Sequence, residues 1–315
     1  MRVRAQPRAG GGCPGGCVTF HCVSSSADVP APTLREARDA AASRLARAGV
    51  GDAEIDAELL LGHVLGLSRG ALQARMVIGG ALEAADASVF EGLVERRAAR
   101  EPLQHLTGRA PFRSLELAVG PGVFVPRPET EQVAQLAIDA LRAAAEPEPI
   151  GVDLGSGSGA IAISLATEVP HARVWAVENS PAAFPWTRRN VDESGAENLT
   201  LVFGDLADAL VELEGRVAVV VSNPPYVPLT MPPRDPEVRL HDPEAALYGG
   251  LDGLDVVRVL SVRARELLRP GGALVIEHAE HQSTEIAAIL SADGWRGIMH
   301  HEDLTRRDRA TTAVR

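Results

Sequence analysis

A four-residue segment, Asn223-Pro224-Pro225-Tyr226, has the residue types needed to hold a planar amino group. Its two prolines fix two φ angles and remove two backbone donors, so carbonyl oxygens are left free to accept hydrogen bonds. The side chain of Asn223 offers a further carbonyl acceptor, and the ring of Tyr226 offers a flat apolar face. We therefore predict that this segment binds an NH2 group through both of its hydrogens.

A glycine-rich segment earlier in the chain has the composition of a strand-to-helix turn that approaches a ligand closely. It reads Asp153-Leu154-Gly155-Ser156-Gly157-Ser158-Gly159-Ala160. Glycine permits sharp turns and close backbone approach, and the helix that follows directs its N-terminus at the ligand. The spacing also matches the dinucleotide pattern G-x-G-x-x-A, so a nicotinamide enzyme is an alternative at this point.

Acidic residues stand after the next two apolar runs. Glu178 lies about 20 positions after the glycines, where a carboxylate can accept both hydroxyls of a ribose. Nicotinamide and other nucleoside cofactors share this need, so Glu178 favours a nucleoside without choosing between them. Asp205 is placed to accept from an adenine amino group, with Leu206 packing on the ring, but a helix N-cap explains Asp205 equally well.

These motifs share one position relative to the expected strands. From Ile150 onward, apolar runs alternate with helical segments, which is typical of a mostly parallel sheet covered by helices on both faces. The runs expected as strands are 150–154, 173–177, 199–203, 217–222 and 273–277. Ligands bind at the carboxyl ends of the strands in such folds, and each motif follows the end of a run.

Residues 33 to about 100 predict a small bundle of three helices. The first opens with a capping box, Thr33-Leu34-Arg35-Glu36, and the second ends near Gly66. We expect Pro102 to stop the third helix. The positions at helical spacing are Ile55, Leu59 and Leu60 in the second helix, and Phe90, Leu93, Val94 and Arg97 in the third.

Residues 103–126 predict a β-hairpin that ends in a turn at Gly120-Pro121-Gly122. Its alternating positions are Leu115, Leu117 and Val119. A helix with an apolar face is expected after Val125-Pro126-Arg127-Pro128-Glu129-Thr130-Glu131. Arg127 and Glu129 either help to close the site or form a surface ion pair.

Composition excludes several classes of protein. The chain has 315 residues, and its 31 basic residues, all Arg, against 42 acidic ones give a net charge of −11. This net charge argues against a protein that binds duplex nucleic acid over a broad surface. Without Lys, neither a Schiff base nor a phosphate-binding lysine is possible. No apolar stretch has the length of a transmembrane helix or a signal peptide, so we expect a cytoplasmic protein without a membrane partner.

The first 30 residues differ in composition from the remainder and are expected to be a disordered extension. They hold Cys13, Cys17 and Cys22, with His21 beside them. The spacing is not that of a zinc site and a second ligand pair is missing, so we expect no metal.

The glycine-rich turn, the two acids and Asn-Pro-Pro-Tyr, each after a successive strand, resemble the class I S-adenosylmethionine-dependent methyltransferases that act on amino nitrogens. Further segments narrow the resemblance to the release-factor glutamine methyltransferase family (HemK/PrmC), over roughly residues 33–315. These segments are Glu101-Pro102-Leu103-Gln104-His105-Leu106-Thr107-Gly108, the segment from Val125 to Glu131, Ala246-Leu247-Tyr248-Gly249-Gly250, Asp252-Gly253-Leu254 and Glu277-His278.

The resemblance implies an α/β fold with a Rossmann-like, seven-stranded methyltransferase sheet. It implies a helical substrate-recognition domain at 31–101, a hairpin linker at 102–128 and a methyltransferase domain at 129–315. The implied reaction moves a methyl group from S-adenosylmethionine to the side-chain amide nitrogen (N5) of the glutamine in the Gly-Gly-Gln motif of peptide chain release factors. A monomer without stably bound nucleic acid is expected.

The same resemblance assigns roles residue by residue. The implied cofactor-binding residues are Gly155, Ser156, Gly157, Ser158, Gly159, Glu178, Asp205, Leu206 and Asn223. The implied glutamine-binding residues are Asn223, Pro224, Pro225 and Tyr226, of which Asn223, Pro224 and Tyr226 are the expected catalytic residues. Glu277 and His278 are expected to support the site without touching the substrate.

Four positions depart from the family pattern. Glu178 stands where the family more often has Asp, and Leu206 stands where an aromatic residue is frequent. His241-Asp242-Pro243 replaces Phe-Glu-Pro, and Arg306-Arg307-Asp308-Arg309 replaces a Gly-Arg pattern. None of these positions lies in Asn-Pro-Pro-Tyr, so the expected reaction class is unchanged.

An amide nitrogen is a poor nucleophile because its lone pair is delocalised, so catalysis must come mainly from orientation and charge placement. We expect the Asn223 side-chain oxygen and the Pro224 carbonyl to accept the two amide hydrogens, with Tyr226 packing on the amide plane. An N6-adenine nucleic-acid methyltransferase is the alternative, because adenine also presents a planar NH2 group. It would need a basic target-recognition region, which the charge of this chain does not favour.

Overall fold

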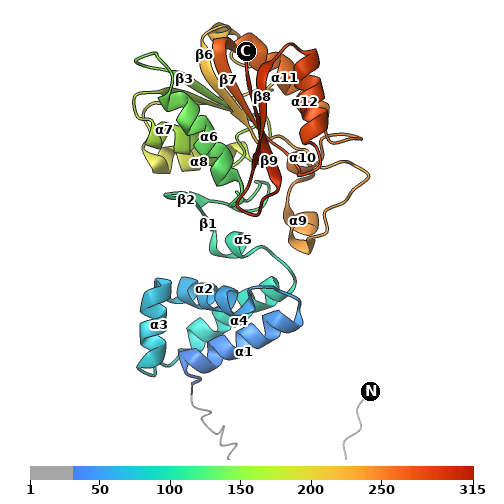
Figure 1. Ribbon diagram of the computed structural model, residues 1–315. Coiled ribbons are helices and arrows are strands. Elements are labelled where there is room, and N and C mark those ends of the chain that lie inside the picture. Colours follow the sequence, from blue (N-terminus) through green and yellow to red (C-terminus); the bar gives the residue numbers. More distant parts are fainter. Residues whose placement is uncertain (1–30) are drawn as a thin grey trace, which may run out of the picture.

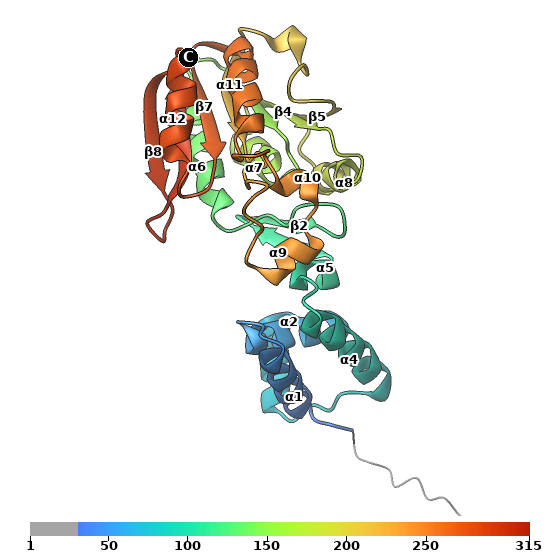
Figure 2. The same ribbon diagram turned by 90° about the vertical axis from the view of Figure 1, so that its right-hand side faces the viewer.

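The computed structural model describes residues 31–315 (Figure 1). The expected extension at 1–30, with the interpretation of Cys13, Cys17 and Cys22, lies outside the described residues. Both views show the helices α1–α4, which lie within residues 34–98, at one end of the molecule and the seven-stranded sheet at the other (Figures 1 and 2). Between them lie α5 (Leu103–Thr107), β1 (Arg109–Phe112), β2 (Leu115–Ala118) and α9 (Pro236–His241). No helix in the part of the chain that the structure describes is long and apolar enough to cross a membrane.

The N-terminal helices enclose an apolar core of their own. The predicted capping box is confirmed: the Thr33 Oγ1 accepts from the backbone N–H of Glu36 at 3.2 Å, and the Thr33 N–H donates to the Glu36 carboxylate at 2.9 Å. Gly66 ends the second helix with a left-handed φ of 62°, as predicted. The helices are α1 (Leu34–Arg47), α2 (Ala53–Leu65), α3 (Arg69–Val77), α4 (Ala84–Ala98) and α5 (Leu103–Thr107).

Three details of the predicted bundle are wrong. Helix α3, opened by a Ser68 side chain that accepts from the Ala71 N–H at 3.3 Å, was not expected. Ile55 and Leu59 are 38% and 37% exposed, because α2 is apolar on more than one side and buries the face that carries Leu60. Helix α4 ends at Ala98 rather than at Pro102, which instead begins α5. Phe90, Leu93, Val94 and Arg97 are buried as a face.

The predicted hairpin is confirmed within residues 109–118, whereas residues 103–107, which the prediction included, form the helix α5 instead. A buried side chain attaches the hairpin to the sheet region. Strands β1 (Arg109–Phe112) and β2 (Leu115–Ala118) pair antiparallel. The Asn190 side chain accepts from the Ala118 N–H at 2.7 Å and donates to the Ala118 oxygen at 3.0 Å. The turn after the hairpin packs its Gly120 so closely on the Trp186 ring that a Cβ there would lie 2.5 Å from a ring carbon. The hairpin is thereby fixed against the helix that carries Asn190 and Trp186.

The large sheet has seven strands in the order β5-β4-β3-β6-β7-β9-β8. The first five strands are parallel to one another, and β9 is antiparallel to both β7 and β8. All five runs expected as strands are strands. The bounds are β3 (Ile150–Leu154), β4 (Arg173–Glu178), β5 (Leu199–Phe203), β6 (Val217–Ser222), β7 (Leu268–Glu277), β8 (Arg296–Glu302) and β9 (Asp308–Val314).

Helices cover both faces of this sheet, as expected (Figures 1 and 2). Because successive side chains of a strand point to opposite faces, Val219 and Val221 pack in one core while Val220 packs in the other. Helices α6 (Thr130–Arg142), α7 (Ala160–Glu168) and α8 (Phe184–Ser194) pack on the first face. Helices α11 (Asp255–Leu267) and α12 (Ser283–Ala292) pack on the second. The short helices are η1 (Val211–Leu213), α9 (Pro236–His241) and α10 (Glu244–Leu247).

Helix α9 connects the segment after β6 to the N-terminal bundle through ion pairs. The Arg97 guanidinium donates to Asp56 at 2.7 Å and to Glu237 at 2.8 Å, and its side chain is only 9% exposed. Arg100 also pairs with Glu237. Burial opposes the ionised form of Glu237, but hydrogen bonds with Asp235, Arg100 and Arg97 hold the pKa of this carboxyl below its usual range. Glu237 therefore stays ionised at neutral pH in its contact with the two guanidinium groups.

Candidate active site

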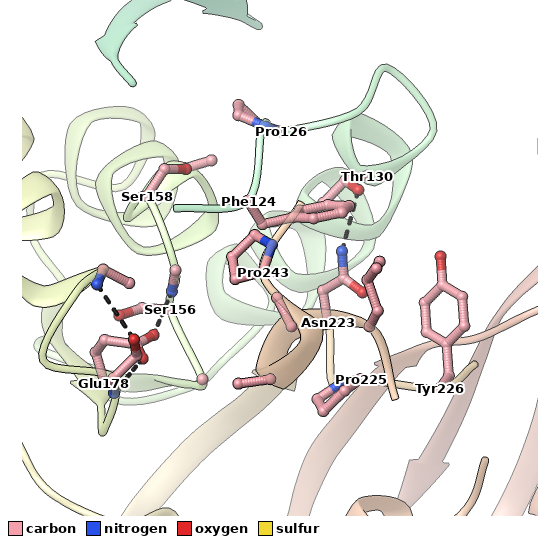
Figure 3. Close-up of a pocket in the computed structure, with 18 of the residues that line it drawn as sticks. Phe124, Pro126, Thr130, Ser156, Ser158, Glu178, Asn223, Pro225, Tyr226 and Pro243 are labelled. Atoms are coloured by element: carbon pink, nitrogen blue, oxygen red, sulfur yellow. Dashed lines mark hydrogen bonds between the residues drawn. The ribbon is translucent and has the colours of Figure 1, made fainter. Parts of the chain in front are cut away.

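A cavity of about 500 Å³ lies at the carboxyl ends of β3, β4 and β6 (Figure 3). The chain enters the sheet at β3, continues outward through β4 and β5, and then crosses to β6 on the other side of β3. Such a switch point is where ligands bind in open α/β sheets. The walls come from the glycine-rich turn, Glu178, the tetrapeptide after β6, the segment 122–130 and the segment 233–248.

The glycine-rich turn adopts a backbone conformation that requires its glycines. Gly155, Gly157 and Gly159 have φ angles of 79°, 56° and 84°, which L side chains rarely adopt. At Gly159 a Cβ would also lie 3.2 Å from both Ile163 and Thr187. The turn is held to the neighbouring strand because the N–H groups of Gly155 and Ser156 both donate to the Val177 oxygen at 2.9 Å.

Glu178 is fixed between this turn and the start of the next connection (Figure 3). One carboxylate oxygen accepts from the Gly157 N–H and the other from the Ser180 N–H, both at 2.7 Å. The residue is 6% exposed and lines the cavity. Since each carboxylate oxygen can accept more than one hydrogen bond, Glu178 retains acceptor capacity for hydroxyl groups of a ligand.

Two further polar groups on this side of the cavity are buried without a protein partner among residues 31–315. They are the Oδ1 of Asp153 and the Oγ of Ser156. Burial raises the pKa of the Asp153 carboxyl to about 7, although a hydrogen bond from the Ala162 N–H opposes the shift. Buried polar groups without a partner are costly, so these atoms fit a ligand that brings its own donors, such as an amino group.

The predicted pair after β5 is only partly at the cavity. Leu206 lines it, whereas Asp205 is exposed and does not. The Asp205 carboxylate accepts from the Ala207 N–H at 2.9 Å in a local turn, and because residues 206–210 form turns, the N-cap alternative for Asp205 is wrong. The side chain of Asn179 also reaches Asp205, at 3.4 Å.

The tetrapeptide after β6 contributes three of its four residues to the cavity wall (Figure 3). Asn223, Pro225 and Tyr226 line the cavity, while Pro224 is buried and does not. The Asn223 Nδ2 donates to the Thr130 hydroxyl at 3.4 Å, and among the described residues the Oδ1 has no partner. The main-chain oxygen of Tyr226 accepts from the Gln282 side chain at 2.9 Å. Burial raises the pKa of the Tyr226 phenol, so the ring stays neutral.

The sequence did not reveal how two distant segments meet across the cavity. Arg127, which lines the wall, donates to Asp242 at 2.5 Å and lies over the Phe124 ring, 4.9 Å from its centroid. The Asp242 side chain is 1% exposed, so the pair closes the cavity wall and is not a surface ion pair. Burial raises the pKa of Asp242, with Arg127 opposing the shift. Glu129, in contrast, is exposed.

Comparisons with known proteins agree with this architecture. The sheet, the glycine-rich turn after β3 and the cavity beside it define an α/β methyltransferase, and residues 114–229 match the family model described as the methyltransferase small domain. Residues 36–108 match the PrmC N-terminal domain. The release factor glutamine methyltransferase of Streptomyces coelicolor is 52% identical over 275 residues, which cover 87% of this chain and 95% of that protein. The chain therefore belongs to the release factor glutamine methyltransferase family.

Other relatives show the range of the family. The release factor glutamine methyltransferase of Bifidobacterium longum is 44% identical over 87% of this chain and 97% of that protein. A protein of Streptomyces pristinaespiralis named 4-amino-L-phenylalanine/4-methylamino-L-phenylalanine methyltransferase is 39% identical over 90% of this chain and 96% of that protein.

Proposed function

We propose that this chain transfers a methyl group from S-adenosylmethionine to the side-chain amide nitrogen (N5) of the glutamine in the Gly-Gly-Gln motif of peptide chain release factors. The observation that carries the proposal is the carboxamide of Asn223, whose Nδ2 is bound by Thr130 and whose Oδ1 is left as an acceptor at the cavity. The names of the relatives support the same substrate.

Asn223 and Pro224 orient the nucleophile. The Asn223 Oδ1 and the Pro224 carbonyl oxygen accept the two hydrogens of the glutamine amide, which directs the nitrogen toward the methyl donor. Both acceptors also stabilise the positive charge that develops on the nitrogen as the new N–C bond forms and the bond from the methyl group to the sulfonium sulfur breaks, which leaves S-adenosylhomocysteine as the product. Tyr226, neutral and held through its main-chain oxygen, packs on the amide plane. The methylated nitrogen then releases a proton to water, so no strong general base is required.

The glycine-rich side of the cavity binds the cofactor, which supplies an electrophilic sulfonium methyl group. Gly155, Ser156, Gly157 and Ser158, which line the cavity, would hold its amino-acid portion, with Gly159 shaping the turn, and Asp153 and Ser156 would accept from its amino group. Glu178 accepts the ribose hydroxyls. Leu206 would pack on the adenine, whereas the exposed Asp205, which already accepts from the Ala207 N–H, would make only a weak contact with the adenine amino group.

The remaining parts of the proposal concern partners. Residues 31–101 recognise the release factor, residues 102–128 link this domain to the methyltransferase domain, and residues 129–315 catalyse the reaction. The protein works as a cytoplasmic monomer without stably bound nucleic acid. The adenine alternative is disfavoured by the net charge of −11 and by relatives named for protein glutamine or a free aromatic amine.

Mass spectrometry of a bacterial release factor tests this proposal. The factor is incubated with the protein and S-adenosylmethionine, digested and fragmented. A mass gain of one methyl group on the glutamine of Gly-Gly-Gln is expected. The matched control is a release factor with that glutamine replaced by alanine, which should gain nothing. Methylation elsewhere, or none despite measured cofactor binding, would overturn the proposal.

A further inference from the structure

A buried carboxyl group stands directly behind Asn-Pro-Pro-Tyr. Strands β6 and β7 are parallel neighbours, and Ser222 pairs with Ile276 at the end of the ladder. Asn223 and Glu277 therefore follow at matching positions of adjacent strands. Glu277 is 2% exposed, and its Oε2 has no hydrogen-bond partner among the described residues. A buried acid with an unused oxygen beside a binding residue requires an explanation, because such groups are costly.

Two hydroxyl groups connect Glu277 to the tetrapeptide. Thr130, the first residue of α6, is 3% exposed and accepts from the Asn223 Nδ2. Among the described residues the structure shows no hydrogen bond to the Glu277 carboxyl, and the Thr130 and Tyr226 hydroxyls each lower the pKa of this carboxyl, as neighbouring donors do. A hydroxyl has one hydrogen to donate. Because Thr130 receives its hydrogen bond from Asn223, its own hydrogen is available to Glu277.

We propose that Glu277 is a positioning residue for methyl transfer: as a carboxylate it takes the hydrogen of Thr130, and so keeps the Asn223 Nδ2 on Thr130 and the Asn223 Oδ1 at the substrate. This inference rests on the proposed function and deepens it. The direction of the hydrogen bonds carries the argument. An acceptor at 277 requires a donor at Thr130, and Thr130 then accepts only from an NH2 group.

Reversing the direction of the hydrogen bond between Thr130 and Glu277 explains why an acid is needed at position 277. A neutral group that donates to Thr130 turns the Thr130 hydrogen toward Asn223. The Asn223 side chain then rotates to offer its oxygen to Thr130 and presents its NH2 group to the cavity. The NH2 group of Asn223 would then face the NH2 group of the substrate glutamine. The substrate amide would lose the Asn223 oxygen as an acceptor and would no longer be oriented. Misplacement on this scale costs about a hundredfold in rate.

The protonation state of Glu277 therefore sets the orientation of Asn223. Burial raises the pKa of Glu277 to about 7, against the opposing effects of Thr130, Arg309 and Tyr226. Glu129 raises it further. His278, the next residue on β7, is engaged with the Ala279 oxygen and the Thr311 hydroxyl. Since the carboxylate is the active form, kcat should fall as the pH drops through about 7 and be constant above it.

Turnover of the full-length protein with a release factor and saturating S-adenosylmethionine provides the first test. Glu277→Gln and Thr130→Val should each lower kcat about a hundredfold and remove the dependence on pH. Thr130→Ser, which keeps the hydroxyl, should retain most of kcat and the wild-type pH profile. Cofactor affinity, measured by calorimetry, should change less than about twofold. Glu168→Gln replaces a half-buried acid at the end of α7 that is bound by Arg113 and Arg142 and does not line the cavity, and is the matched control with wild-type behaviour.

A second readout is independent of the substrate. The side-chain NH2 signals of Asn223 in a nitrogen-15 spectrum, assigned by their loss in Asn223→Asp, should shift with pH around a midpoint near 7. They should not shift in Glu277→Gln. A wild-type-like kcat in Glu277→Gln or Thr130→Val, a loss of cofactor binding in either, or pH-independent Asn223 signals would overturn the inference. A wild-type protein that does not methylate the release factor would refute the proposed function instead, and the nitrogen-15 titration would still decide the role of Glu277.

Discussion

The two ends of the cavity are built in different ways. At the glycine-loop end, comprising residues 155–159 and Glu178, most contacts are made by backbone N–H groups within adjacent strands β3 and β4 and the turns after them, and side chains of α8 add two hydrogen bonds to backbone oxygens of the loop. At the tetrapeptide end, comprising residues 223–226, the contacts are between side chains of distant segments, such as Thr130 with Asn223 and Arg127 with Asp242. Contacts made by the backbone give the cofactor side of the cavity a fixed shape. Contacts between side chains can set the orientation of a single reacting group, such as the Asn223 amide.

The substitution with the largest expected effect on activity distinguishes the two ends of the cavity. Asn223→Ala should lower kcat by about 10²–10³-fold, because it removes an acceptor that acts on the developing charge. The affinity for S-adenosylmethionine should change little. Steady-state kinetics with a release factor and calorimetry with the cofactor measure both quantities. A comparable loss in both would mean that the two ends are not functionally distinct.

Glu178→Ala should show the opposite pattern. It removes the acceptor for the Gly157 and Ser180 N–H groups and for the ribose, so cofactor affinity should fall roughly 10–100-fold. At saturating cofactor, kcat should stay within a few-fold of wild type. Unchanged cofactor affinity in calorimetry would contradict the assignment of Glu178.

The pair that closes the tetrapeptide end should act mainly on substrate binding. Arg127→Ala leaves the buried Asp242 without its partner, so the KM for the release factor should rise about tenfold. Asp242→Asn and the double variant complete a thermodynamic cycle. Effects of the two single substitutions that simply add would show that the pair does not act as a unit.

The smallest effects are expected after β5, where the predicted residues differ in exposure. Leu206→Ala should weaken cofactor binding about fivefold by removing apolar contact. Asp205→Ala should weaken it less than about twofold, because the exposed carboxylate already serves the Ala207 N–H. Calorimetry on both variants compares their cofactor affinities. A larger loss of affinity in Asp205→Ala than in Leu206→Ala would show that adenine binding depends on this acid.

The sequence predicted the parts of the molecule that depend on local patterns. The capping box at Thr33, the hairpin, the left-handed Gly66 and the glycine-rich turn all follow from neighbouring residues. The central strands were located because both of their faces are buried, which makes them continuously apolar. Strand β8 was not located, because it lies at the edge of the sheet and is largely exposed and polar.

The parts that were not predicted depend on contacts between distant segments. Helix α3 is short and exposes most of its surface, so its apolar signal is weak. The buried face of α2 was misassigned because its sequence is apolar on more than one side. The partners of Asn223 and Arg127 lie 93 and 115 positions away along the chain, and no spacing rule links such residues.

The ion pairs of Glu237 with Arg97 and Arg100 have a consequence for building hybrids of family members. They connect a helix of the N-terminal bundle to a segment that also contributes Val238 to the cavity wall. A bundle transplanted from a relative would seat correctly only if it supplied guanidinium groups at both places, because an unpaired buried carboxylate is strongly destabilising. In a chimera, the N-terminal bundle and the methyltransferase domain are therefore compatible only if the ion pairs of Arg97, Arg100 and Glu237 are kept.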